Sequence, residues 1–367
     1  MPSRFLLALG VLLTPFLVGV PQSAADTTPR PRWDTRVFAT VPSPGFPAYV
    51  YRHPNGRVYA GTYTNPLGDS IASRVFEWNE DGTLLRSWTV PGQDLATEHG
   101  VQVATSDARG RLVLLERSTS SVLTLNLRTG RFRTQARLPD LPRCATGRRP
   151  CSPNAADSPA IPNYATWGPR GALYVSDYGQ AVIWRIPARG GAPRIWFASA
   201  ALDGTEFGTT GLVFQPERRA FLIAQQTTSD LTSNPPVGKL YRLSVDDAGR
   251  PGALTTLWRS RIGELPDGFG IARSGRIYVA NVGLSNQLVE LSPDGRELDR
   301  FPKVPMLGDN GSPVPFDGPS SATFLGTRVL VANQSPLLGT ASHHVVLDVE
   351  VGEEGAPAHV PRRSRLR

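Results

Sequence analysis

Two side chains that are suited to chemistry stand directly before segments of strand-like alternation. His99 begins the run HGVQVAT, and an imidazole is the side chain best suited to move a proton near neutral pH. Asp267 lies in Pro266-Asp267-Gly268, just before the run FGIAR. Its place before a strand favours a functional role, but Pro-Asp-Gly is also a good turn sequence, and a channel histidine can be purely structural. Both interpretations of each residue stay open until the elements that position them are known.

Common catalytic and nucleotide-binding motifs do not occur in this sequence. It has no G-x-S-x-G elbow, no P-loop and no dinucleotide-binding glycine fingerprint. The net charge of +8 does not indicate nucleic-acid binding either, because the cations are nearly all arginines scattered among acidic residues. We expect a monomer whose partner is a small-molecule substrate or ligand.

The first 25 residues predict an export signal. Arg4 precedes the apolar run FLLALGVLLTPFLVGV, and Ser23-Ala24-Ala25 offers a small-residue cleavage site before Asp26. A membrane anchor is the alternative, but the run is short, contains Pro15 and has no basic stop after it. No other stretch approaches membrane-spanning length. We therefore expect a secreted, extracellular protein with no membrane span after removal of the signal.

Export makes the two cysteines interpretable. Cys144 and Cys151 lie in RCATGRRPCSPN, a segment with glycine and proline and no regular periodicity. A zinc site needs four ligands, and no other cysteine or paired histidine is nearby. In an oxidising compartment we expect a disulfide that closes this small loop and contributes roughly 2–3 kcal/mol by loop entropy.

A repeated pair of strands accounts for most of the remaining sequence. GALYVSDYGQAVIWRI, residues 171–186, reads as two strands joined by a turn, and five other segments follow the same pattern. Each pair has a further strand before it, such as GVQVAT, and another after it, such as RIWFA. The copies begin at intervals of about fifty residues, near the period of propeller blades. They start with GRVYAGTY, GRLVLLER, GALYVSDY, RAFLIAQQ, GRIYVANV and TRVLVANQ.

We therefore predict an all-β fold, a six-bladed β-propeller of four-stranded antiparallel blades. Stacking blades about an axis buries their apolar faces, and closing the ring removes the open ends. RVFATV, residues 36–41, has no blade of its own and is expected to close the ring as an N-terminal strand of the last blade. A solenoid needs polar capping repeats, and none is visible; five or seven blades remain alternatives. The propeller is expected to span residues 26–360, followed by a basic flexible tail at 361–367.

Two blades carry a resemblance to a known family. PNYATWGPRGALYVSDYGQAVIWRI and PDGFGIARSGRIYVAN resemble blades of the gluconolactonase, regucalcin (senescence marker protein) and paraoxonase group. ANQS at 332–335, followed by VVLDVEVGEEG, resembles a terminal blade of its secreted bacterial members. The resemblance covers nearly all of the mature chain. It implies a hydrolase of lactones or related esters with a divalent cation, usually calcium, at the top of the central channel.

The resemblance also implies a set of metal ligands. Family members supply them from the first residues of the innermost strands: Glu in the first blade, Asn in the third and fourth, and Asp in the fifth. Asn163 matches the third-blade position, and Asp267 matches the fifth, where family members have a ligand and general base. Thr210 replaces the fourth-blade Asn, and Ala48 replaces the first-blade Glu, which removes a carboxylate.

Two functions remain open at this point. His99-Gly100 resembles a His-Gly of paraoxonases, whose histidine is implicated in proton transfer, and Glu98 or Glu206 could replace the lost charge. The first hypothesis is a calcium-dependent lactonase or esterase in which Asp267 or His99 handles the proton. The second is a non-catalytic module that binds a small ligand or partner protein and keeps a degraded metal site; the loss at Ala48 favours it.

Overall fold

The structure, a computed structural model, describes residues 29–366 except 205–207, 228–236 and 338. Strands supply nearly all regular structure in these residues, and the helices described are 3-10 turns of three residues. The predicted export signal at 1–25 and Glu206 lie outside the described residues. No described helix has the length and apolar character needed to cross a membrane.

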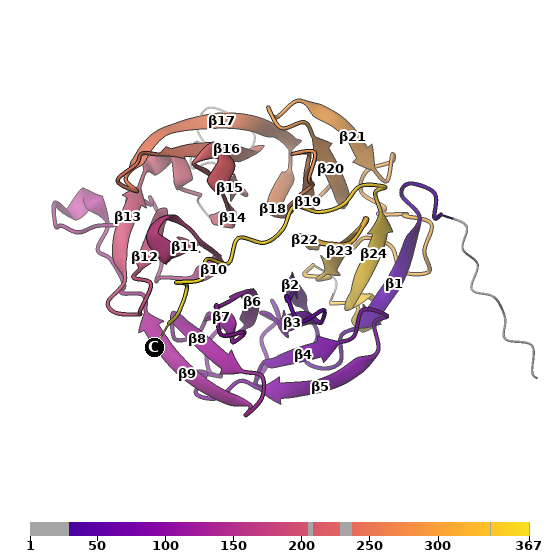
Figure 1. Cartoon of the computed structure of the whole chain (residues 1–367), viewed down its shortest axis with the longest axis horizontal. Coiled ribbons are helices and arrows are strands. Elements are labelled where there is room, and N and C mark those ends of the chain that lie inside the picture. The colour runs from indigo at the N-terminus through magenta and orange to yellow at the C-terminus, as the bar shows by residue number, and fades with distance from the viewer. Residues whose placement is uncertain (1–28, 205–207, 228–236, 338, 367) are drawn as a thin grey trace, which may run out of the picture. The chain divides into compact units, whose positions relative to one another are not determined.

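Six four-stranded antiparallel sheets surround a central axis in the unit Pro31–Arg367 (Figure 1). Blade one comprises β2 (Pro47–Arg52), β3 (Val58–Thr62), β4 (Arg74–Trp78) and β5 (Leu84–Thr89). Blade two comprises β6 (Val101–Ser106), β7 (Leu112–Glu116), β8 (Ser121–Asn126) and β9 (Arg131–Arg137). Blade three comprises β10 (Pro162–Trp167), β11 (Leu173–Asp177), β12 (Val182–Ile186) and β13 (Arg194–Ala198).

The remaining blades follow the same plan. Blade four comprises β14 (Thr209–Gln215), β15 (Ala220–Gln225), β16 (Val237–Val245) and β17 (Pro251–Ile262). Blade five comprises β18 (Glu264–Ile271), β19 (Ile277–Gly283), β20 (Gln287–Leu291) and β21 (Glu297–Phe301). Blade six comprises β22 (Pro319–Leu325), β23 (Arg328–Asn333), β24 (Val345–Glu350) and β1 (Thr35–Thr40). The predicted six-bladed, four-stranded propeller is confirmed.

The N-terminal strand closes the ring. β1 pairs antiparallel with β24, from Thr35 opposite Val349 to Thr40 opposite Val345. Blade six therefore combines its outer strand from the start of the chain with three strands from near its end (Figure 1). This is the closure that the unpaired segment 36–41 predicts, and it leaves the propeller without a free pair of end blades.

Large aromatic side chains pack between neighbouring blades, as the sequence predicts. Trp78, Trp184 and Tyr241 are 1%, 1% and 3% exposed and belong to three different apolar clusters. The cluster around Trp184, for example, includes Leu115 from blade two. Because each sheet buries both faces in this way, the inner strands are held firmly enough to define a site on the axis.

A buried polar side chain lies at or near the end of the second strand of every blade. Asp177 is one example: its Oδ1 accepts from the backbone N–H groups of Ile161, Gly179 and Gln180, at 3.0, 3.0 and 3.2 Å. Its Oδ2 accepts from Trp184 Nε1 at 2.7 Å. These contacts confirm that Asp177 holds the turn that follows β11.

The equivalent residue of blade five behaves differently. Asn281 occupies the corresponding place in β19, which continues two residues past it to Gly283. It is fully buried, yet neither Oδ1 nor Nδ2 has a hydrogen-bond partner among the described residues. Unlike Asp177, it forms no hydrogen bond to a turn in the described part of the chain.

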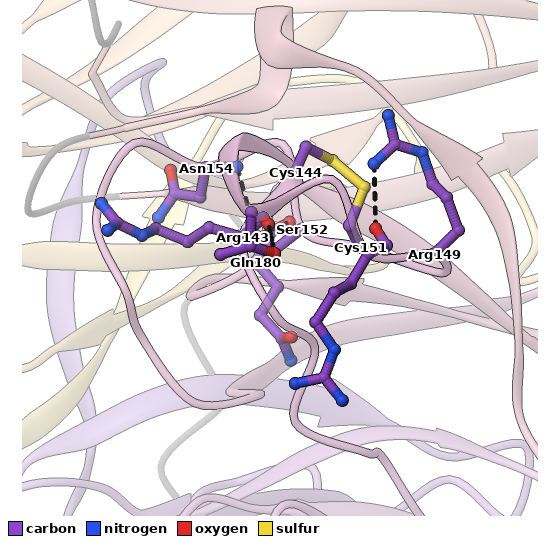
Figure 2. The surroundings of a disulfide bond; sticks show 9 residues. Arg143, Cys144, Arg149, Cys151, Ser152, Asn154 and Gln180 are labelled. Atoms are coloured by element: carbon purple, nitrogen blue, oxygen red, sulfur yellow. Dashed lines mark hydrogen bonds between the residues drawn. A yellow bond between two sulfur atoms is a disulfide. The ribbon is translucent and has the colours of Figure 1, made fainter.

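Cys144 and Cys151 form the predicted disulfide (Figure 2). The residues that follow Cys151 dock on the turn between β11 and β12, where Ser152 Oγ donates to the Gln180 carbonyl oxygen at 2.9 Å. Asn154 Nδ2 donates to the neighbouring carbonyl of Gly179 at 2.8 Å. The disulfide thus closes a loop whose C-terminal flank is anchored to blade three by its own hydrogen bonds.

The C-terminal segment 352–366, here called the C-terminal strap, crosses the ring from blade six toward blade two (Figure 1). Gly355 forms an isolated antiparallel bridge with Ala272, just after the end of β18. The His359 ring lies 5.6 Å from the ring of Phe214, near the end of β14. Leu366 is 1% exposed in the apolar cluster of blades two and three. The strap therefore lies at the face where the inner strands end.

The basic tail is consequently not free of the fold. The Ala108 N–H donates to the carbonyl of Ser364 at 2.8 Å, and the Arg365 N–H donates to the carbonyl of Ala188 at 3.1 Å. The expectation of a flexible tail is wrong for 361–366. The segment PRRSRLR is mostly basic, but its leucine, Leu366, occupies a core position. Arg367 lies outside the described residues.

Candidate functional site

In five blades the inner strand is irregular at its start. The pairing register with the second strand breaks after Pro319 in blade six, and in the other four blades it breaks after Pro47, Pro162, Thr209 and Pro266. The residues that follow the breaks in these four blades are Ala48, Asn163, Thr210 and Asp267. A β-bulge re-aims the side chain at the break, and such bulges are common beside functional sites. The four positions assigned to metal ligands by resemblance therefore share one local geometry.

Blades three, four and five bring these strand starts together. Ser176 Oγ accepts from the Tyr164 N–H at 3.0 Å and donates to the Thr210 carbonyl oxygen at 2.7 Å. Thr210 Oγ1 in turn donates to the Pro266 carbonyl oxygen at 3.2 Å. The chain of hydrogen bonds links the residue after Asn163 to the residue before Asp267. All three predicted oxygen donors thus lie at the same end of the channel.

Asn163 and Asp267 both carry a buried oxygen with no hydrogen bond. Asn163 is 5% exposed and Asp267 is half-buried. Neither Asn163 Oδ1 nor Asp267 Oδ1 has a hydrogen-bond partner among the described residues. A buried acceptor without a donor costs about 1–3 kcal/mol, so these two oxygens are positions where a bound donor or cation would gain most.

The surroundings of Asp267 oppose its ionisation. Burial raises the pKa of Asp267 well above its ordinary value of 3.8, and the nearby Tyr164 hydroxyl opposes this rise. The Tyr164 hydroxyl itself donates to the Ser320 carbonyl oxygen at 2.8 Å, from blade six across the channel. This environment favours the protonated carboxyl group, the direction in which enzymes shift a carboxyl that acts as a general acid or base.

The positions of Thr210 and Ala48 contribute less to a metal site. The Thr210 hydroxyl proton is committed to Pro266, so only its lone pairs could face a cation. Ala48 has no side-chain oxygen, and its carbonyl oxygen accepts from Ser320 Oγ at 2.9 Å. Among the described residues there is no group of three or more His, Cys, Asp or Glu side chains that could hold a metal ion. The donor set is thus one carboxylate, one amide and one hydroxyl.

Tyrosines that the sequence analysis did not single out surround this end of the channel. The rings of Tyr49 and Tyr164 lie 4.3 Å apart, and each follows a ligand position directly in the chain. The Tyr178 hydroxyl donates to Gln226 Oε1 at 3.0 Å. Burial, and then the Asp267 carboxylate, raise the pKa of Tyr178 well above 10.0. The signal in the sequence was the repeated pairing of a strand-start residue with tyrosine, as in Ala48-Tyr49 and Asn163-Tyr164.

Arg117 is a second side chain that sequence reasoning missed. It follows β7, pairs with the Glu98 carboxylate and donates from Nη1 to the Tyr63 hydroxyl at 3.3 Å. Burial raises the pKa of Tyr178, and the Arg117 guanidinium lowers it. Arg117 therefore lies near the tyrosines at this end of the channel. Glu98 therefore pairs with Arg117. The carboxylate that could replace the first-blade Glu is thus already engaged in an ion pair.

His99 lies apart from the other predicted site residues. Its Nδ1 faces the Thr97 carbonyl oxygen at 3.0 Å, and its Nε2 faces the Ile71 carbonyl oxygen at 2.9 Å and Asp69 Oδ1 at 3.2 Å. Burial lowers the pKa of His99, but the two carbonyls and Asp69 outweigh it and raise the pKa above 6.5. With acceptors at both nitrogens, His99 favours the imidazolium form and holds two loops together. The structure shows no contact between His99 and Asp267 among the described residues.

These features define a class of fold with six sheets around a central axis and strand starts that converge at one end, the six-bladed propellers. The chain matches no protein-family model and no curated protein sequence. Solved structures with the same fold include regucalcin from Agrobacterium tumefaciens, described as a calcium-binding protein, with 16% identity, a TM-score of 0.57, and coverage of 89% of this chain and 98% of that one. A protein described as a gluconolactonase has 14% identity, a TM-score of 0.56, and coverage of 88% and 94%. A luciferin-regenerating enzyme has 13% identity, a TM-score of 0.54, and coverage of 86% and 95%.

Proposed function

We propose that this protein is a secreted, divalent-cation-dependent hydrolase of a lactone or related ester, acting at the axial site of Asn163, Thr210 and Asp267. The proposal depends most on one observation, the two buried oxygens Asn163 Oδ1 and Asp267 Oδ1, which lack hydrogen-bond partners in the described part of the chain. The fold that it shares with a gluconolactonase and a calcium-binding regucalcin supports the same assignment.

The donor set suits a hard cation that keeps much of its coordination for water and substrate. Oxygen atoms of carboxylate, amide and hydroxyl groups are what calcium and magnesium prefer, and one or two carboxylates suffice when waters complete the sphere. A bound divalent cation supplies Lewis-acid polarisation of a substrate carbonyl and lowers the pKa of a coordinated water. Without the carboxylate that Ala48 replaces, we expect weak, millimolar to micromolar affinity.

The protein's own residues would handle the proton. In lactone hydrolysis the oxygen of a water attacks the carbonyl carbon, and the ring C–O bond breaks. Asp267 would accept the proton that the attacking water loses and would deliver it to the departing alkoxide. The Tyr164 hydroxyl, whose proton goes to the Ser320 carbonyl, would lie beside the Asp267 carboxyl and limit its movement. The tyrosines around the mouth would exclude bulk water from the reacting group.

Asp267→Asn tests the proposal directly. The purified mature chain is assayed on a panel of lactones and aryl esters with calcium, magnesium or EDTA. We expect cation-dependent hydrolysis in the native protein and a drop of at least 100-fold in kcat for Asp267→Asn, because the variant cannot accept the proton. Asp294→Asn is the matched control, since Pro293-Asp294-Gly295 is the same triplet in an exposed turn.

Other results would reject the enzymatic assignment. Equal activity of the Asp267 and Asp294 variants would show that the triplet acts only as a turn. No hydrolysis and no calorimetric binding of calcium or magnesium would leave the non-catalytic binding module as the function. Native mass spectrometry should find a monomer that begins at Asp26 when the protein is recovered from the medium of its host.

A further inference from the structure

A hollow of about 330 Å³ lies between blades three and four, and it shares no residue with the axial site. Its walls come from the turn between β10 and β11, from the outer strands of blade three, and from the turn that leads into β17. Three arginines line it, Arg170, Arg185 and Arg250, together with the rings of Tyr174 and Trp196. No acidic residue is among the described residues that line it.

Two of these arginines, Arg170 and Arg185, line the hollow beside Tyr174. Arg185 stands opposite Tyr174 in the pairing of β11 with β12. Burial raises the pKa of Tyr174, while Arg185 and then Arg170 lower it, so both guanidinium groups act on the same hydroxyl. Within the described residues neither Arg170 nor Arg185 forms an ion pair. Two neighbouring cations without a carboxylate repel each other, and an oxyanion between them removes that cost.

The third arginine already has a carboxylate partner, whereas the C-terminal strap brings a further arginine near the hollow. Arg250 pairs with Asp246 at 2.7 Å, and its side chain remains 78% exposed. Arg363 of the strap lies against Gly171, next to Arg170: its Cβ is 3.3 Å from the point where a Cβ on Gly171 would lie. The strap thus places a further arginine of the tail beside the rim of the hollow.

Trp196 gives the hollow a fixed apolar wall. Its Nε1 donates to the Gly249 carbonyl oxygen at 2.9 Å, which ties blade three to blade four. Its ring meets Tyr174 edge-on at 4.9 Å and lies 5.1 Å from the ring of Phe221. The indole is half-buried, so its free face is held in place before any ligand arrives.

We propose that this hollow binds a small organic anion, in which a carboxylate, sulfate or phosphate group lies between Arg170 and Arg185 and a flat body lies on Trp196. Guanidinium groups bind such oxyanions through paired, charge-assisted hydrogen bonds. The indole face supplies dispersion contact and the apolar area that a bare inorganic ion could not use. The hollow is a binding site for the anion, separate from the proposed chemistry on the axis.

Calorimetry on the purified mature chain, with simple probes, tests this site. Benzoate carries a carboxylate on a flat ring, benzamide is its neutral counterpart, and inorganic sulfate is an oxyanion without a flat body. We expect saturable binding of benzoate, at least tenfold weaker binding of benzamide, and affinities for benzoate and sulfate that fall as sodium chloride is raised.

The variants are chosen so that the fold stays intact. Arg170 has a left-handed φ of 61°, so Arg170→Gly removes the charge at a backbone position that glycine favours. Combined with Arg185→Gln it should weaken benzoate binding at least tenfold without lowering the thermal midpoint by more than a few degrees. The control removes two exposed arginines of blade two, Arg128→Gln with Arg131→Gln, and should leave the affinity unchanged.

Trp196→Ala separates the two halves of the proposal. It should weaken benzoate binding while sulfate binding persists. Equal binding of benzoate and benzamide, or equal losses in the blade-three and blade-two variants, would show a general surface effect and overturn the site. Because Asp267→Asn leaves this hollow untouched, failure of the axial hydrolase and failure of the anion site are distinguishable.

Discussion

At the scale of single residues, some buried polar side chains have all their hydrogen-bond partners within the fold. Others keep an oxygen atom that has no partner among the described residues. Asp177 receives four hydrogen bonds from the backbone and from Trp184, and its role is complete within the protein. Asn163 and Asp267 have buried oxygens that nothing in the described residues satisfies. A ligand that binds side chains of the second kind gains most, because the folded protein already carries the free-energy penalty of the unpaired oxygen.

Asp177→Asn should destabilise the protein by about 1–3 kcal/mol. The amide replaces one acceptor with a donor, so either Trp184 Nε1 or a group of backbone N–H donors faces another donor. Urea denaturation measures the loss, and the exposed Asp294→Asn should change the free energy of unfolding by less than about 0.5 kcal/mol. Similar midpoints for the two variants would contradict the role assigned to Asp177.

His99 predicts a pH dependence of stability. Its folded pKa lies above the unfolded value of 6.5, so the folded state binds the proton more tightly. Its stabilising contribution is therefore complete below pH 6.5 and is lost as the pH rises through the folded pKa. Thermal midpoints of the native protein and His99→Gln, measured from pH 5.5 to 9, should differ most at the acid end. A difference that grows toward alkaline pH would show that His99 is held neutral.

At the scale of strands and turns, the site depends on features that could not be predicted from the sequence alone. Alternation and turn residues predicted six blades and the strand 36–41 that closes them, because each strand must present an apolar face and each turn has its own chemistry. The bulge after Pro162 or Pro266 leaves no such pattern, since it depends on which residue of β11 or β19 lies opposite. The convergence of Tyr164 with Ser320 likewise joins residues 156 positions apart.

Blade five contains a buried ion pair that should be tested at this scale. Arg300 and Glu264 are 6% and 4% exposed and pair directly, while Arg300 also contacts Glu297 and Gln287. Arg300→Ala leaves the Glu264 carboxylate buried without its cation and should cost about 3–5 kcal/mol in denaturant unfolding.

The control for this pair is the neighbouring exposed Arg296→Ala, which should change the free energy of unfolding by less than about 0.5 kcal/mol. Replacing both partners, Arg300→Met with Glu264→Leu, should be less harmful than Arg300→Ala alone, because no unpaired charge remains. A double variant that is worse than the single one would show that the pair matters chiefly for packing.

For the whole molecule, the strap and β1 secure the ring from opposite ends of the chain. Leu366 should behave as a core residue although it is the penultimate residue of the sequence. Leu366→Ala is expected to cost about 2–4 kcal/mol, and Leu337→Ala, at a leucine that is 77% exposed, is expected to be neutral. Calorimetric melting compares the two variants. Identical transition temperatures would show that the tail is frayed, as its composition suggests.

The pairing of β1 with β24 also sets the order of events during synthesis. The first strand of the described body waits, without its neighbour, until residues near 350 have left the ribosome. Until then five sheets exist as an open arc whose end surfaces are exposed to solvent and to other chains. The protein therefore has no finished state short of nearly full length, and a nascent chain that stalls before β24 is a substrate for chaperones and proteases.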